Sequence, residues 1–376
     1  MYENLILCLS LYRTGVRDLE GSTDRFSKQL YNRVLLNVRT ITDSFIGYFG
    51  EDDFVELVGN PAGFSALCIS AGLDEFNTNS ILYVLTALKD SVKVEMGVGI
   101  AGGAFTERFV VPKEIEHIGE EMGLAPFSIQ RLIYSSRIVA KIDDAAVQDG
   151  YRLWLHVFIF SRNANWAVIQ IGCKSTLNRI YHWFSGRVVN RSFVDEPHTG
   201  LLSDVLNRYS LDFTLHENES LREATLETLT LPINRLRNVF NAVVPPSQMT
   251  LNSLIGVGQV GDENPLKMPV KINWKTISLI HGLSLRDFEE LLSVKGIGAE
   301  TLRFLAICAN KLLGINPSLI DRADLFNNFK PINIDERVEE LFYELLEAVK
   351  YSRLNACYSK MIVSRLLGWW GAKQHN

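Results

Sequence analysis

The stretch YRLWLHVFIFSRNANWAVIQIG, residues 151–172, decides the fold class that we predict for this chain. Its two halves are rich in aromatic and β-branched residues, which favour strands. The polar residues SRNAN, 161–165, separate the halves and indicate a turn. We therefore expect an antiparallel hairpin centred on this turn. The predicted cross-strand pairs are Phe160 with Trp166, Phe158 with Val168, and His156 with Gln170.

Alternation along the two strands predicts two different faces. The aliphatic face, expected in the core, holds Leu153, Leu155, Val157, Ile169 and Ile171. The other face mixes aromatic, basic and amide groups, namely Arg152, Trp154, His156, Phe158 and Gln170. A mixed face of this kind is typical of a nucleotide-contacting surface. It is equally typical of a second packed face beneath a helix.

Most of the remaining chain has the apolar spacing of amphipathic helices, including one long C-terminal helix over residues 334–367. A Pro-Pro pair and a glycine-rich run interrupt this pattern and predict a linker at residues 245–271. We therefore expect an α+β fold. Its helix-rich N-terminal domain, residues 1–244, contains the small antiparallel sheet. Its C-terminal all-α domain, residues 272–376, contains the hairpin between helices described below.

Composition limits the classes of function. The 376 residues are 47% hydrophobic and carry a formal net charge of −5, which argues against a protein that coats nucleic acid indiscriminately. The five cysteines are scattered, as in a protein of a reducing compartment. No stretch approaches the roughly 20 apolar residues that a membrane-spanning helix needs. We expect a cytoplasmic protein without membrane contacts.

Two helical patterns flank the five residues Val294-Lys295-Gly296-Ile297-Gly298. This arrangement resembles the helix-hairpin-helix motif of DNA repair and replication proteins. The unpaired amides and the positive dipole end of the second helix favour a phosphate group, so we expect DNA binding without sequence preference. The predicted contact residues are Lys295, Gly296, Ile297, Gly298, Thr301 and Arg303. A tight turn that binds nothing is the alternative.

Base-excision glycosylases of the endonuclease III type often carry a lysine two residues after the second glycine of this motif. Glu300 stands there and cannot form a Schiff base. The resemblance therefore disfavours a lysine-dependent glycosylase. An aspartate-dependent enzyme stays open, with Asp321 as the nearest candidate.

Carboxylates and histidines flank the predicted β-hairpin, in KIDDAAVQDG (141–150) and VDEPHTG (194–200). These groups suit acid–base or metal-assisted hydrolysis of a phosphodiester. The predicted catalytic residues are Asp149, His156, His198, Gln148 and Gln170. No local spacing demands a divalent metal such as Mg²⁺ or Mn²⁺, and each histidine is alternatively a satisfied structural residue.

Two glycine runs, GVGIAGG (97–103) and GVGQVG (256–261), have dinucleotide-binding spacing. Neither leads directly into a helix, so we disfavour a nucleotide cofactor. The turn at Gly102 and Gly103 is instead a candidate for presenting amides to an anion.

Several of these segments, together with YRTGVRDL (12–19) and AAVQDGY (145–151), are similar to the archaeal and bacterial family catalogued as domain of unknown function 763. The similarity extends from about Tyr12 to Leu313. It implies a soluble prokaryotic protein concerned with nucleic acids. Members tend to carry a histidine pair at Leu155-His156 and lysine at Glu300, so the resemblance also implies a divergent member with weakened or lost activity.

We therefore predict a DNA-binding protein of DNA repair or processing, either a nuclease or a DNA glycosylase. The alternative is a non-catalytic subunit that binds nucleic acid or a protein partner. In that case the C-terminal helix, with Trp369 and Trp370, would provide the partner surface.

Overall fold

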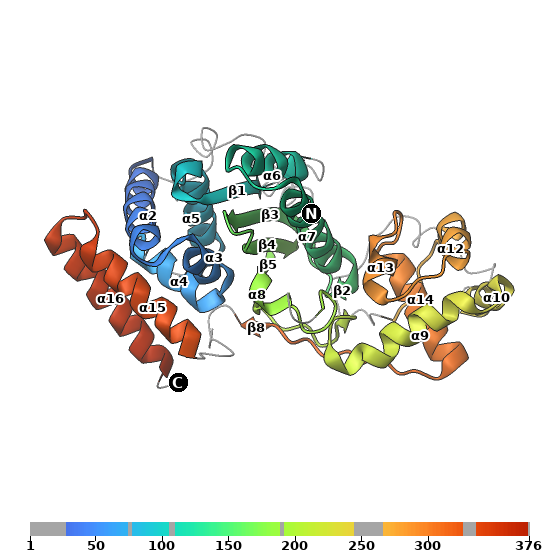
Figure 1. The fold of residues 1–376 in the computed structure, drawn as a ribbon. Coiled ribbons are helices and arrows are strands. Elements are labelled where there is room, and N and C mark those ends of the chain that lie inside the picture. The colour runs from blue at the N-terminus through green and yellow to red at the C-terminus, as the bar shows by residue number, and fades with distance from the viewer. Residues whose placement is uncertain are drawn as a thin grey trace.

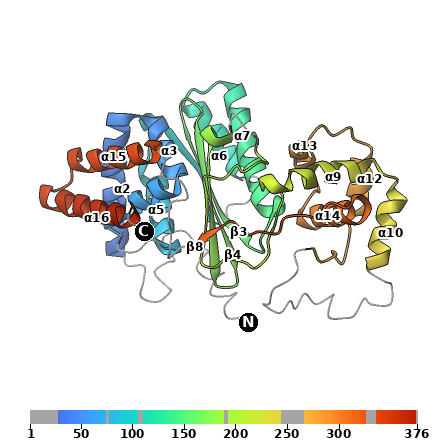
Figure 2. The same cartoon turned by 90° about the horizontal axis from the view of Figure 1, so that it is seen from below.

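The computed structural model describes residues 28–73, 77–104, 110–188, 192–243, 266–325 and 336–374. At its centre lies a six-stranded sheet, seen nearly edge-on in Figure 2. In spatial order the strands are β1 (Val98–Ala104), β3 (Arg152–Ser161), β4 (Trp166–Lys174), β5 (Leu177–Phe184), β6 (Gly200–Ser203) and β8 (Asp324–Leu325). All neighbours are antiparallel except β6 and β8. A mainly antiparallel sheet flanked by helices is an α+β fold, so the predicted fold class is confirmed.

The β3–β4 hairpin has the predicted register. Phe160 lies opposite Trp166, and His156 lies opposite Gln170. The amide of Ser161 donates to the carbonyl of Asn165 at 2.9 Å and closes the turn. Local alternation and turn composition were therefore sufficient to set this pairing.

The predicted faces are wrong at the start of β3. The register shifts between Leu153 and Leu155, which indicates a β-bulge at Trp154. Trp154 packs with Leu155 in one core cluster, whereas Leu153 contacts the cluster on the opposite face. One extra residue reverses the alternation before it, so Trp154 does not share a face with His156.

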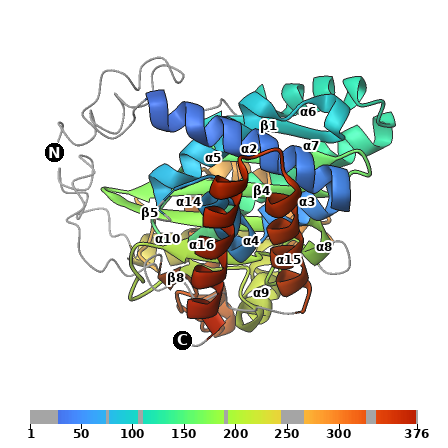
Figure 3. The same cartoon turned by 90° about the vertical axis from the view of Figure 1, so that its left-hand side faces the viewer.

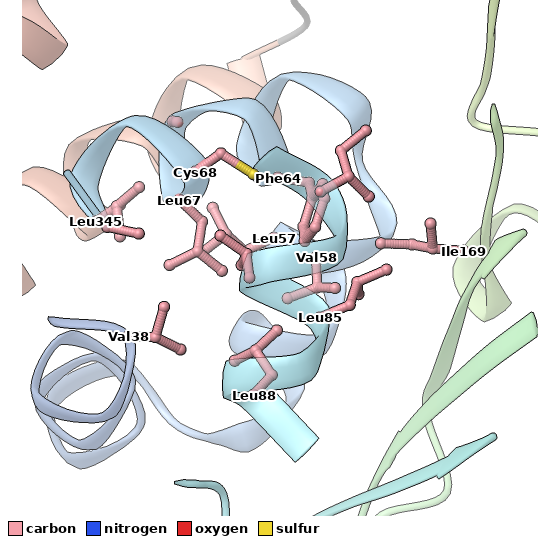
Figure 4. Close-up of a cluster of buried hydrophobic side chains, with 14 of the residues drawn as sticks. Val38, Leu57, Val58, Phe64, Leu67, Cys68, Leu85, Leu88, Ile169 and Leu345 are labelled. Atoms are coloured by element: carbon pink, nitrogen blue, oxygen red, sulfur yellow. The ribbon is translucent and has the colours of Figure 1, made fainter. Parts of the chain in front are cut away.

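Helices from both ends of the chain cover one face of the sheet, as Figures 1 and 3 show. They are α2 (Lys28–Phe49), α3 (Glu51–Gly59), α4 (Pro61–Ser70), α5 (Thr78–Ser91), α15 (Glu336–Tyr351) and α16 (Ala356–Gln374). All ten residues of α4 are buried, because this helix lies among its neighbours. Figure 4 shows the shared core, in which Leu67, Ile169 and Leu345 come from an early helix, the sheet and a late helix.

The predicted single C-terminal helix is wrong. Helix α15 ends at Tyr351, and the side chain of Asn355 accepts a hydrogen bond from the Cys357 amide at 2.9 Å at the start of α16. The ring of Trp370 is buried and stacks on Phe342 with centroids 4.1 Å apart. Trp370 thus belongs to the core and is not presented to a partner.

On the other side of the sheet lie the helices between these two groups, of which the first two pack against the strands and the rest form a bundle beyond them, as Figure 2 shows. They are α6 (Val110–Glu121), α7 (Pro126–Lys141), α9 (Glu219–Thr230), α10 (Ile233–Val243), α12 (Trp274–His281), α13 (Phe288–Ser293) and α14 (Ala299–Leu313). One π-helical turn, Ile142–Ala146, joins α7 to the short strand β2 (Val147–Gln148), which pairs with β7 (Leu211–Asp212). Within residues 272–376, predicted as one domain, α12–α14 lie on this side of the sheet and α15 and α16 lie on the other. The predicted linker lies mostly in 244–265, outside the described residues.

Candidate nucleic-acid interface and buried polar cluster

Helices α13 and α14 are joined by the five residues 294–298, hereafter the 294–298 hairpin. Lys295 and Gly296 at its tip are exposed. Ile297, predicted as a DNA contact, is only 1% exposed and packs into the core instead. The tip is therefore open to solvent while its base is anchored.

The two glycines of this hairpin differ in what the fold requires of them. Gly296 has φ +95°, and a Cβ there would lie 2.8 Å from Oγ1 of Thr276. Gly298 has an extended backbone, φ −144°, and a Cβ there would meet nothing within 4 Å. Only at Gly296 does the backbone adopt a positive φ that favours glycine over other residues. At Gly298 the missing side chain leaves open space before α14.

The start of α14 presents free amides. The neighbouring helices α12 and α13 are capped by the side chains of Asn273 and Asp287, but Gly298 has no side chain to cap α14. Within the described ranges, the amides of residues 299–301 have no hydrogen-bond acceptor. Such amides carry the positive end of the helix dipole.

Three side-chain contacts fasten the 294–298 hairpin to the end of α7 and to β2. The amine of Lys141 donates to the carbonyl of Ile297. The Gln148 amide donates to the carbonyl of Ala299 at 2.9 Å, and Nε of Arg303 donates to Oε1 of Gln148 at 2.9 Å. Gln148, predicted as catalytic, thus binds Arg303, predicted as a DNA contact, and both hold the hairpin in place.

Three of the predicted catalytic residues meet around one carboxylate, Asp143, on the face of the sheet beneath α7. Nδ1 of His156 lies 2.8 Å from Oε1 of Gln170, whose amide donates to Oδ2 of Asp143. Nε2 of His198 lies 2.7 Å from the other oxygen, Oδ1. Nε1 of Trp183 donates to Oδ2 at 2.9 Å. We call these residues the Asp143 cluster.

The hydrogen bonds assign the protons of His156. Because the Gln170 amide donates to Asp143, its oxygen is free to accept, so Nδ1 of His156 is the donor. Nε2 then accepts from the hydroxyl of Ser136 in α7, 3.0 Å away. Burial lowers the pKa of His156, which favours this neutral form.

Asp149 belongs to a separate, fully paired group beside the Asp143 cluster. Its carboxylate accepts from Arg179 Nη1 at 3.0 Å, the Tyr181 hydroxyl at 2.7 Å and the Tyr151 amide at 3.0 Å. Nη2 of Arg179 donates to Asp321 at 2.7 Å. Burial raises the pKa of Asp149, and the charge of Arg179 opposes this shift. These contacts favour a structural role for Asp149 and for Asp321.

Other polar groups lie apart or are already paired. His182 is on the opposite face of the sheet, where burial lowers its pKa to about 3 and its ring lies 5.8 Å from that of Phe64. The Gly102 amide donates to Glu114 at 2.5 Å and is not available to an anion. The second glycine run lies outside the described residues. Among the residues that are described, no group of three or more His, Cys, Asp or Glu side chains could hold a metal ion.

Asp143 lies in the acidic segment 141–150 but is not among the predicted catalytic residues. Its partners Trp183, Gln170 and His198 lie 27 to 55 residues further along the chain. One local signal was present. Asp143 follows Val139 by four residues, which places it on the buried face of the same helical segment.

The fold and the site define an α+β protein with a buried His–Asp pair and a solvent-exposed hairpin between two helices. The chain belongs to the family described as protein of unknown function (DUF763), whose family model matches residues 15–328. The predicted family is thereby confirmed. No curated protein matches the chain, and no solved structure matches it. Among the described helices, none is long and apolar enough to cross a membrane.

Proposed function

We propose that this chain is a DNA-binding protein of DNA repair or processing that docks on the sugar-phosphate backbone through the 294–298 hairpin. The observation that carries the proposal is the half-exposed start of α14, where three amides lack acceptors and Gly298 leaves open space. A phosphate oxygen fits such a position, because it completes the hydrogen bonds and meets the positive dipole end. Lys295, exposed at the tip, forms no ion pair within the described residues and adds attraction.

The proposal extends to chemistry through the way the hairpin is held. Lys141 and Gln148, which bind the carbonyls of Ile297 and Ala299, flank Asp143 in the same short segment. A strand docked at the hairpin would therefore be held at a fixed position relative to the Asp143 cluster. There His198 is the candidate general base, because Asp143 orients its ring. A nuclease or a glycosylase is the corresponding enzyme class.

Replacing Gly298 with aspartate is expected to weaken duplex binding by about tenfold or more, equivalent to ~1.4 kcal/mol. The new carboxylate would occupy the phosphate position and accept from the free amides. Gly298 is the N-cap of α14, where aspartate is a favoured residue. The free energy of unfolding should therefore stay equal or rise by a few tenths of a kcal/mol. Fluorescence anisotropy with a labelled duplex at low salt measures binding, and thermal unfolding measures stability.

Gly282→Asp is the matched control, because Gly282 is exposed, has φ −88°, and a Cβ there would have no neighbour closer than 3.7 Å. This variant adds the same charge in the same helical region, and its duplex affinity should stay within about twofold of the wild-type value. Gly296 is unsuitable, since any substitution there is strained. Equal affinity of the Gly298→Asp variant and the wild type, with both folded, would exclude the hairpin as the contact.

The non-catalytic alternative is favoured by one observation, the burial of Asp143, Gln170 and Asp149. Incubation of labelled single-stranded, duplex and damaged DNA with Mg²⁺, Mn²⁺ or EDTA separates the two functions. For an enzyme we expect strand or base release that disappears in His198→Ala, with binding retained. Binding without any product under all these conditions would indicate a non-catalytic subunit.

A further inference from the structure

The exposed side of α7 carries aromatic and basic residues in one row. Its members are Phe127, Gln130, Arg131, Tyr134, Arg137 and Lys141. At 100° per residue they lie within about 120° of arc, so they form one face, which we call the α7 stripe. The opposite side of the helix is buried and carries Ser136, which contacts the Asp143 cluster.

The stripe is positively charged and has few internal partners. No acidic residue occurs in α7. Arg137 forms no ion pair with any described residue, and the guanidinium of Arg131 lies 5.8 Å from the ring centre of Phe127. Phe127 is 72% exposed and Tyr134 is 42% exposed. Phe127 is therefore held largely in water beside a cation, whereas the half-exposed ring of Tyr134 also packs edge-on against Phe193.

The stripe leads to the 294–298 hairpin. Its Tyr134 hydroxyl donates to Glu289 of α13 at 2.5 Å, and its last member, Lys141, donates to the carbonyl of Ile297. Figure 1 shows α7 beside α13. From Phe127 to Lys141 the helix is about 21 Å long at ~1.5 Å per residue. A nucleic acid leaving the hairpin would follow Lys141, Arg137 and Arg131 along this face, passing the carboxylate of Glu289 beside Tyr134.

We propose that the α7 stripe binds an unpaired strand that continues from a duplex held by the hairpin, so that the preferred substrate is a junction between double- and single-stranded nucleic acid. This inference rests on the proposed function. Unpaired bases stack on exposed aromatic rings regardless of sequence, and arginine side chains contact phosphates and ring faces. A blunt duplex keeps its bases stacked inside and gains nothing from Phe127.

The test compares the affinities for two labelled substrates, a blunt duplex of about 20 base pairs and the same duplex with a thymidine tail of about ten nucleotides, long enough to span the stripe. For the wild type we expect about tenfold tighter binding of the tailed duplex, within the range that stacking of a single base supplies. Phe127→Ala should lose most of this preference, because the remaining arginines attract the tail without a ring for its bases to stack on. A uridine tail in a parallel arm distinguishes an RNA strand from a DNA strand.

Tyr48→Ala is the control, because Tyr48 is 62% exposed on α2, on the other side of the sheet. It should keep the preference for the tailed duplex. A wild type without this preference, or a Phe127→Ala variant that retains it, would overturn the inference. If Gly298→Asp still weakens binding in that case, the hairpin proposal stands alone. If the wild type binds neither substrate, both proposals fail.

Discussion

Replacing Arg179 with alanine is expected to lower the free energy of unfolding by about 3–5 kcal/mol. Arg179 is 1% exposed and is paired with Asp149 at 3.0 Å and with Asp321 at 2.7 Å. Its removal leaves two buried carboxylates without a counter-charge, and the cost of that burial greatly exceeds the net contribution of the intact pairs. Urea denaturation followed by circular dichroism gives the change in free energy.

Arg286→Ala is the control for this measurement. The Arg286 side chain is 83% exposed in its ion pair with Glu290, so its loss should cost less than about 0.5 kcal/mol. Arg179→Lys should recover only part of the stability, because an ammonium group cannot bridge the two carboxylates as a planar guanidinium does. If the alanine variants at 179 and 286 had equal stability, burial would not be what gives Arg179 its effect.

The second large effect is expected at Asp143, where alanine should destabilise the fold by more than about 3 kcal/mol. Three buried or half-buried donors, on Gln170, Trp183 and His198, would lose their common acceptor. Each buried donor left unsatisfied costs about 1–3 kcal/mol. Asp143→Asn keeps the shape and one acceptor oxygen, so its loss should be smaller. The same denaturation experiment measures both variants.

The adjacent Asp144 provides the control, since it is exposed and carries the same side chain in the same π-helical turn. Asp144→Ala should stay within about 0.5 kcal/mol of the wild type. Equal losses at the two positions would show that the effect comes from the backbone of the turn. The carboxylate of Asp143 would then not be the organising group of the cluster.

Features set by nearby residues could be predicted from the sequence. The register of the β-hairpin follows from alternation and from the polar turn, and the 294–298 hairpin follows from two glycines between amphipathic helices. The bulge at Trp154 could not be predicted, because Leu-Trp-Leu also fits regular alternation. A single inserted residue becomes apparent only when the partner strand is known.

Features that depend on distant contacts were missed for the same physical reason. The spacing of apolar residues in α15 shows that one side is buried, but it does not say against which layer. Likewise, the sequence around Asp149 shows a carboxylate but not Arg179, thirty residues away, that neutralises it. The buried partners of Asp149 favour a structural role for it, and the contacts of Asp143 place that carboxylate at the centre of the polar cluster.

The packing of α15 and α16 has a practical consequence for recombinant work. The family match ends at residue 328, before these two helices begin. Their apolar sides, with Leu341, Leu345 and Trp370, fill the core beside α2 and α4. A fragment that ends at the family boundary would expose this apolar surface and would be prone to aggregation. Expression plasmids should therefore encode the chain through its last helix.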